Sequence, residues 1–154
     1  MKYIRKSICS LLLCVSMLAV LLTGCSGGKG TAATGDARIL IATCAKGDAF
    51  RDMLIAALES ACDEQGIGHD TVYAEQSAEQ QVAQVKEAKS QGYTAVICRL
   101  IDVDTALQVE RAADGLPVIF VNNCPDEGYL KADEYIYVAS NESVAGSYQA
   151  QYVL

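Results

Sequence analysis

Short apolar runs alternate along the chain with longer segments whose apolar residues recur every three or four positions. The runs lie at residues 38–44, 95–100, 117–121 and 135–139, and a shorter one lies around residues 71–73. A nearly continuous apolar run of this length is typical of a strand that is buried on both faces of a parallel sheet. The pattern therefore predicts five strands.

The segments between these strands have the periodicity of amphipathic helices. The first predicted helix ends at Gly66, and its apolar residues recur at helical spacing. They are Phe50, Met53, Leu54, Ala57, Leu58, Ala61 and Cys62. A second helix is predicted over residues 78–90, with Gly92 as its stop signal. Its inward face consists of Val82, Val85 and Ala88.

Two further helices follow the same pattern. One is predicted over residues 104–114, with Asp104 as its N-cap. The other begins after Asn141, which is expected to cap it. Its apolar positions are Val144, Ala145, Tyr148 and Tyr152. Residues 122–134, between the fourth and fifth strands, are expected to form a polar connection.

Strands that alternate with helices in this way indicate an α/β fold with a doubly wound parallel sheet, for which we expect the strand order 2-1-3-4-5. A ligand binds such a sheet at the carboxyl ends of its strands. The informative residues are therefore those that follow the strands. They occupy residues 45–50, 99–104, 122–126 and 140–142.

The first 24 residues have the pattern of an export signal. Three cations lie within the first six residues, before an uncharged apolar run at residues 8–22 that is too short to span a bilayer stably. The sequence LTGC at residues 22–25 resembles the lipobox of bacterial lipoproteins, which implies that Cys25 carries a diacylglycerol and becomes the new N-terminus. The alternative is an ordinary signal peptide that carries a cysteine. Because acyl chains bind membranes by about 0.8 kcal/mol per buried CH₂, we expect an extracytoplasmic protein anchored by lipid in a bacterial cell envelope.

Residues 26–36 are small, polar and rich in glycine, which is typical of a flexible tether. The expected organisation is therefore a signal peptide at residues 1–24, a lipidated cysteine and tether at residues 25–37, and a folded part at residues 38–154.

The charge of the chain excludes one class of partner. Its 154 residues suffice for about one domain and include 12 basic and 19 acidic residues, a net charge of −7. Without residues 1–24, 9 basic and 19 acidic residues remain. An anionic body of this kind argues against nucleic acid or an anionic membrane face as partner, because phosphate binding needs clustered Lys and Arg. The hydrophobic fraction of 51% is too high for a disordered chain.

The sequence offers little support for catalysis. A single histidine, His69, cannot form a zinc cluster and is expected to be a solvated surface residue. Neither a G-x-S-x-G elbow nor a P-loop nor an H-E-x-x-H motif occurs. A phosphoryl-accepting receiver domain needs acidic residues after the first and third strands and a Lys after the fifth, where this chain has Cys44, Arg99 and Ser140. We therefore expect no enzyme, no cofactor and no metal.

Four cysteines follow Cys25, namely Cys44, Cys62, Cys98 and Cys124. Three of them lie at or just beyond the ends of strands that are expected to be neighbours, so a thiol cluster is one interpretation. The other is that they are small apolar core groups, since no C-x-x-C spacing occurs. Thiols that stay free outside the cytoplasm would indicate a reducing habitat.

Four segments that follow the strands resemble type I periplasmic sugar-binding proteins, most closely the galactose/glucose-binding branch. They are GDAF at residues 47–50, LID at 100–102, PVIFVNN at 117–123 and YIYVASNES at 135–143. The resemblance covers essentially all of residues 38–154. It implies two lobes that clamp a sugar between them and a protein that presents the sugar to an ABC permease and its ATPase.

The resemblance assigns roles to three residues. Phe50 matches an aromatic that stacks on a pyranose, Asp48 a carboxylate that accepts from sugar hydroxyls, and Asn122 an amide that both donates and accepts. These residue types suit a ligand with an apolar C–H face and a ring of hydroxyls. Two alternatives stay open: that Phe50 begins the buried stripe of its helix, and that Asp48 is only a helix N-cap.

Two positions depart from the family pattern. Arg99 stands where the galactose-like pattern has an Asn, and Asn123 stands where relatives carry a basic residue. An Arg at the cleft favours a carboxylate or a phosphate on the ligand, or a more polar sugar. The expected ligand-binding residues are thus Asp48, Phe50, Arg99, Asn122 and Asn123. Asp102 is expected to be a structural loop residue.

The length departs from the family as well, because the chain ends at Leu154, roughly where the family's backbone crosses into its second lobe. The sequence therefore predicts the N-terminal lobe alone, without the C-terminal lobe, of a sugar-binding ABC transporter lipoprotein. A membrane-anchored sensor or interaction module that uses the same lobe is the alternative. A thiol or metal enzyme at Cys44, Cys98 and Cys124 is a third, weaker hypothesis.

Overall fold

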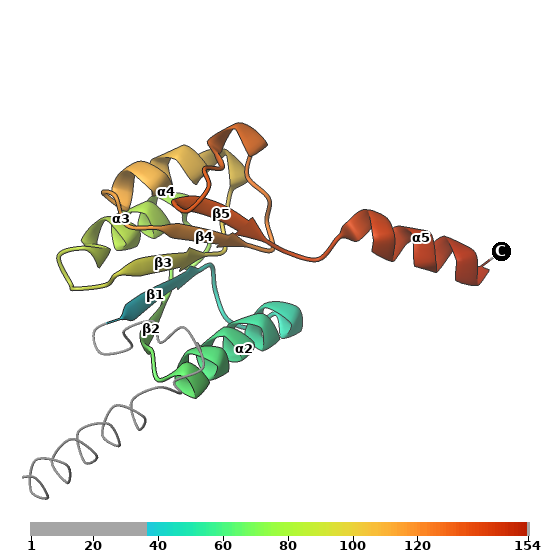
Figure 1. The fold of residues 1–154 in the computed structure, drawn as a ribbon, viewed down its shortest axis with the longest axis horizontal. Helices are drawn as coiled ribbons and strands as arrows, with labels where there is room; N and C mark the ends of the chain where they lie inside the picture. The colour runs from blue at the N-terminus through green and yellow to red at the C-terminus, as the bar shows by residue number, and fades with distance from the viewer. Residues whose placement is uncertain (1–36, 154) are drawn as a thin grey trace, which may run out of the picture. The chain divides into compact units, whose positions relative to one another are not determined.

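A five-stranded parallel sheet organises the computed structural model, which describes residues 37–153 (Figure 1). The strands are β1 (Arg38–Thr43), β2 (Gly68–Tyr73), β3 (Ala95–Cys98), β4 (Val118–Val121) and β5 (Tyr135–Val138). They lie in the order β2-β1-β3-β4-β5, and every neighbouring pair is parallel. The α/β class and the strand order predicted from the sequence are therefore confirmed.

Helices lie on both faces of the sheet, with α3 and α4 on one face and α2 on the other (Figure 1). The helices are α2 (Ala49–Gln65), α3 (Ala78–Ala88), α4 (Ala106–Ala112) and α5 (Glu142–Val153), and short 3₁₀ turns are η1 (Val103–Thr105) and η2 (Glu127–Tyr129). Both faces of β1 and β3 are consequently buried, which explains their nearly continuous apolar sequences.

The larger core lies between the sheet and the helices α3 and α4. Its largest fully buried side chain is Phe120, which packs with Val96, Cys98 and Val118 at 0% exposure. Burial of apolar surface contributes roughly 25 cal/mol per Å², so this face supplies much of the stability of the fold.

A smaller core lies beneath α2 and contains Ile41, Ile55, Ile97 and Val121. Of the apolar series predicted for α2, Cys62 is buried, and Leu54 and Leu58 pack against this core. Ile55 is buried, whereas Phe50 and Met53 are 53% and 64% exposed. The apolar residues of α2 occupy a broad arc, and the sheet covers only one side of it.

The start of the helix after β3 and the burial of His69 differ from the sequence predictions. The helix expected from residue 104 begins with the turn η1, and Asp102 rather than Asp104 caps that turn by accepting from the Asp104 N–H at 3.0 Å. Asp102 is thus a structural loop residue, as expected. His69 is not a solvated residue, because its side chain is only 17% exposed, within β2 and 3.8 Å from Asp63.

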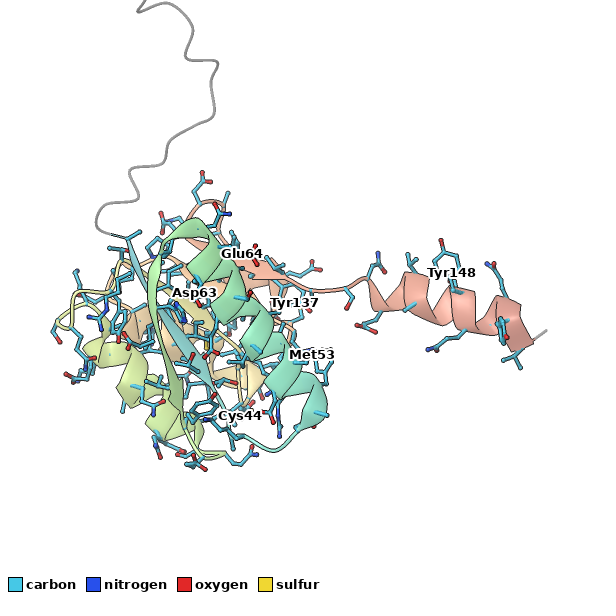
Figure 2. All side chains as sticks on the ribbon, turned by 90° about the horizontal axis from the view of Figure 1, so that it is seen from below. Cys44, Met53, Asp63, Glu64, Tyr137 and Tyr148 are labelled. Atoms are coloured by element: carbon cyan, nitrogen blue, oxygen red, sulfur yellow. The ribbon has the colours of Figure 1, made fainter. Side chains whose placement is uncertain are left out.

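Helix α5 begins as predicted, with the side chain of Asn141 accepting from the Val144 N–H at 3.1 Å. Three of its four predicted apolar positions are exposed: Val144 at 46%, Tyr148 at 68% and Tyr152 at 94%. Figure 2 shows Tyr148 on this helix. Among residues 37–153, no helix has the length and apolar character needed to cross a membrane. The predicted export signal, the lipidated Cys25 and most of the tether lie outside the described residues.

Candidate functional site

The carboxyl ends of all five strands lie at one edge of the sheet, because every strand pair is parallel. The loops after β1, β3 and β4 therefore meet at this edge. These loops and the first turn of α2 carry the five residues predicted to bind a ligand. We call this region the carboxyl edge.

Asp48 is the N-cap of α2. Its carboxylate accepts from the backbone N–H of Arg51 at 2.9 Å, and this hydrogen bond holds the pKa of Asp48 below its usual value, against a smaller opposing effect of desolvation. The guanidinium groups of Arg51 and Arg99 lower the pKa further. The capping role expected of Asp48 is confirmed, and its carboxylate remains charged in the loop between β1 and α2.

Phe50 borders a pocket of about 190 Å³ between α2 and the ends of β4 and β5. The pocket is lined by Phe50, Leu54, Leu58, Val121, Asn122, Val138, Ala139 and Ser140. Since the Phe50 ring is 53% exposed, the alternative that it belongs to the buried stripe of its helix is wrong. The pocket brings Phe50 and Asn122 together from distant parts of the sequence. Two larger hollows of about 310 Å³ beside α3 have no aromatic side chain in their lining.

Asn122 adopts a left-handed backbone conformation directly after β4, with φ of 67°. Asparagine tolerates this conformation better than most residues with a side chain. Its N–H donates to the carbonyl of Val138, and its own carbonyl accepts from the hydroxyl of Tyr137 at 3.0 Å. Its Oδ1 accepts from Arg99 Nε at 3.2 Å, and its Nδ2 is the donor group of the same side-chain amide.

Arg99 follows β3 and is half-buried. Besides its bond to Asn122, it donates through Nη1 to the Sγ atom of Cys44 at 3.0 Å. Cys44 lies at the end of β1, near the first turn of α2 (Figure 2). Burial alone would raise the pKa of the Cys44 thiol, but the Ala45 N–H, the Arg99 guanidinium and the other neighbouring donors and charges lower it.

Asn123 contacts the protein backbone: its Nδ2 donates to the carbonyl of Leu100 at 2.8 Å. It therefore pins the loop after β3. The same loop is held by Gln81, a fully buried residue of α3. The Gln81 amide donates to the carbonyl of Arg99 at 2.9 Å and accepts from the N–H of Ile101 at 3.2 Å. Two amides thus fix the backbone that carries Arg99.

Sequence reasoning missed Gln81 and Arg51. Gln81 lies one helical turn before Val85 on the inward face of α3, so its position in the buried stripe was the available signal. Arg51 lies in the first turn of α2, with its Nε 3.8 Å from the Asp48 carboxylate. Within residues 37–153 this Nε is a buried donor without a hydrogen-bond partner.

The thiols after the strands do not form a cluster. Cys98 lies in the core under α3 and α4, where burial raises its pKa to about 12. Cys44 contacts Arg99, and Cys124 is exposed. In the part of the chain that the structure describes, all four cysteines are free, and no three His, Cys, Asp or Glu side chains gather as a metal site would require.

Comparison with known proteins identifies the family of the chain. A model of the periplasmic binding protein domain matches residues 39–154. No curated protein matches the sequence at a significant level.

Solved structures show the same fold at low identity. A periplasmic ribose ABC transporter protein from Conexibacter woesei has a TM-score of 0.69 at 18% identity, covering 78% of this chain and 40% of its own. The arabinose-binding component from Shewanella sp. ANA-3 has a TM-score of 0.58 at 20% identity, with coverages of 75% and 39%. A solute-binding protein from Bacillus halodurans with bound myo-inositol has a TM-score of 0.58 at 22% identity, with coverages of 77% and 44%.

The chain thus spans about two fifths of the length of the solved structures that it matches. Its family is nevertheless clear, because the domain model extends over most of the sequence and the strand order agrees with the type I fold. The chain belongs to the periplasmic binding protein domain family, whose members bind solutes.

Proposed function

We propose that residues 38–154 form the N-terminal, sugar-binding lobe of a solute-binding lipoprotein that serves an ABC transporter. The observation that carries the proposal is the pocket at the carboxyl edge, where the exposed ring of Phe50 and the amide of Asn122 line one hollow. The proposal is further supported by similar structures whose names mention ribose, arabinose and myo-inositol.

The residues of the pocket suit a monosaccharide. The Phe50 ring offers an apolar plate for the C–H face of a pyranose, and the Asn122 amide offers a donor to a hydroxyl. The charged Asp48 carboxylate accepts from hydroxyls on the helix side of the site. Asn123 has a supporting role, because one N–H of its amide donates to the backbone carbonyl of Leu100.

Capture in this proposal involves binding without covalent chemistry. The lobe supplies one wall of a cleft, and closure of a second lobe of the kind found in two-lobed binding proteins completes the contacts. The closed form then presents the sugar to a permease and its ATPase. A lipid anchor on Cys25 and a tether at residues 25–37 keep the protein at the outer face of the membrane.

A second candidate is a membrane-anchored sensor that uses the same lobe. It is favoured by one similar structure, the fructose-binding periplasmic domain of a hybrid two-component system, which has a TM-score of 0.57 at 22% identity over 76% of this chain. The two candidates share the sugar site. They differ in the partner, which is a permease in the first and a signalling protein in the second, so co-purification from native membranes distinguishes them.

The shared site is tested by nuclear magnetic resonance. The full chain, labelled with ¹⁵N and held in a detergent without a sugar headgroup, is titrated with galactose, glucose, ribose, arabinose and galacturonate. We expect shift changes at the backbone amide of Phe50 and the side-chain amide of Asn122. A panel that moves neither signal contradicts the proposal.

Two variants and a matched control sharpen this test. Phe50→Ala and Asn122→Gly are expected to weaken binding at least tenfold. Met53→Ala removes an equally exposed apolar side chain from the same helix, outside the pocket lining, and is expected to bind as the wild type does.

A further inference from the structure

Arg99 is a cation whose charge is both half-buried and without a carboxylate partner, whereas the other cations without such a partner in residues 37–153, Lys46, Lys86 and Arg111, are exposed. Three cations at the surface each have a carboxylate partner: Arg38 with Asp70, Lys89 with Asp114 and Lys131 with Glu134. Arg99 is half-buried, and among residues 37–153 no carboxylate pairs with it. A desolvated charge without a counter-ion is unfavourable, so this position favours a ligand that brings one.

The guanidinium also has donors to spare. Of its five N–H groups, one on Nε bonds Asn122 and one on Nη1 bonds Cys44. Its remaining N–H groups, including both on Nη2, have no partner in the described residues. A guanidinium with adjacent free N–H groups is suited to a carboxylate, which it binds through two parallel hydrogen bonds.

Arg99 is held in place before any ligand arrives. Its backbone is fixed by Gln81 from α3, and its side chain by Asn122 and Cys44. Arg99 itself does not line the pocket of Phe50, but it donates to Asn122, which does. An anionic group bound by Arg99 therefore lies beside the proposed sugar site. Because the Arg99 side chain is already held in place, its binding costs little conformational entropy.

A second guanidinium reinforces the positive charge. Arg51 has a buried Nε without a hydrogen-bond partner in residues 37–153, and its nearest carboxylate is Asp48 at 3.8 Å. The pKa of Asp48 is lowered by both guanidiniums, after the larger effect of the Arg51 backbone N–H, so all three groups share one electrostatic environment. Two cations and one carboxylate leave a single positive charge, which matches a carboxylate better than a phosphate dianion.

From this arrangement we infer that the site takes an acidic monosaccharide, a uronic acid or a similar sugar acid, whose carboxylate pairs with Arg99 while its ring lies against Phe50. The inference rests on the proposed function and deepens it by naming the substrate class. Arg99 is the residue that determines this specificity, and Gln81 and Cys44 position it.

The test titrates the full chain, in the same detergent, with galacturonate and glucuronate, with their neutral counterparts galactose and glucose, and with glucose 6-phosphate. We expect the acidic sugars to bind at least tenfold more tightly than the neutral ones, and more tightly than the phosphate. Arg99→Gln is expected to abolish the preference, Arg99→Lys to retain part of it, and Arg111→Gln, at an exposed position of α4, to leave it unchanged.

The outcomes separate this inference from the proposed function. Neutral sugars that bind as well as acidic ones, or a preference that survives Arg99→Gln in a folded variant, overturn the inference and leave the proposed function standing. Tighter binding of glucose 6-phosphate overturns the assignment to carboxylates. Acidic sugars that bind only after Cys44→Ala overturn it too, because the Cys44 thiolate is then the counter-ion of Arg99. If no sugar of either kind binds, both proposals fail.

Discussion

Arg99 donates through Nη1 to the Sγ atom of Cys44 at 3.0 Å, so a guanidinium after β3 is bonded to a buried thiol at the end of β1. The contact joins two neighbouring strands at the carboxyl edge. It also couples the ionisation of the thiol to the position of the arginine, which makes Cys44 a reporter on the site.

Replacing Arg99 should make the Cys44 thiol harder to ionise. Burial raises the pKa of Cys44, and Arg99 is among the groups that reverse this effect, so Arg99→Gln is expected to shift the pKa upward. Thiolate absorbance followed against pH, as a difference from Cys44→Ala, measures it. Arg111→Gln should leave the titration unchanged. An unaltered titration in Arg99→Gln would show that the contact with Arg99 does not affect the pKa of the Cys44 thiol.

Asn122 combines a backbone role with a binding role, and two substitutions separate them. A residue with a Cβ other than Asn is unfavourable by about 1–2 kcal/mol in the left-handed region, whereas glycine is not. Asn122→Ala is therefore expected to lower the free energy of unfolding in urea by about 1 kcal/mol, and Asn122→Gly to lower it less. Both should lose sugar binding. Equal stability of the two variants would mean that the conformation is not strained.

Gln81 should matter for the shape of the site although it is remote from solvent. Gln81→Leu leaves the carbonyl of Arg99 and the N–H of Ile101 without their buried partner, which costs roughly 1–3 kcal/mol in unfolding free energy. Gln80→Leu, on the exposed side of the same helix, should change stability by less than about 0.5 kcal/mol. Urea unfolding compares the two variants, and similar midpoints would contradict a structural role for the hydrogen bonds of Gln81 to Arg99 and Ile101.

The buried thiol of Cys98 predicts how stability responds to alkaline pH. Burial raises its pKa from 9.0 to about 12, so the unfolded chain releases this proton at lower pH than the folded chain does. The contribution of the protonated Cys98 thiol to the free energy of unfolding is complete below pH 9 and is lost as pH rises from about 9 to about 12. Relative to Cys98→Ala, the wild type should therefore lose unfolding free energy over this range. Val96→Ala opens a cavity in the same core without removing a titrating group, so its unfolding free energy should fall with pH at the wild-type slope. The same slope in Cys98→Ala would refute the assignment to Cys98.

The strands and helices could be predicted because their signals are local. The apolar run before Cys44 and the helical spacing up to Gly66 depend only on neighbouring residues, and both elements formed where expected. The part of α2 that contacts the sheet was not predictable in the same way. Periodicity defines an apolar arc, but only the packed structure decides that Ile55 rather than Met53 faces the sheet.

The site was predictable in its location but not in its connections. The topology rule placed Asp48, Phe50 and Asn122 at one edge, where the structure has them. It did not reveal that Asn123 bonds a backbone carbonyl, or that Gln81 is buried. Hydrogen bonds between elements produce no periodic pattern in the sequence. A polar residue on a buried helix face is assigned to the exposed face when burial is predicted from hydropathy.

Stacking of a sugar on Phe50 at the carboxyl edge is detected by saturation transfer from the aromatic protons of the full chain to a bound sugar. We expect transfer to the C–H protons on one face of the pyranose, lost in Phe50→Ala and retained in Met53→Ala. Equal transfer in the wild type and Phe50→Ala would contradict stacking on Phe50.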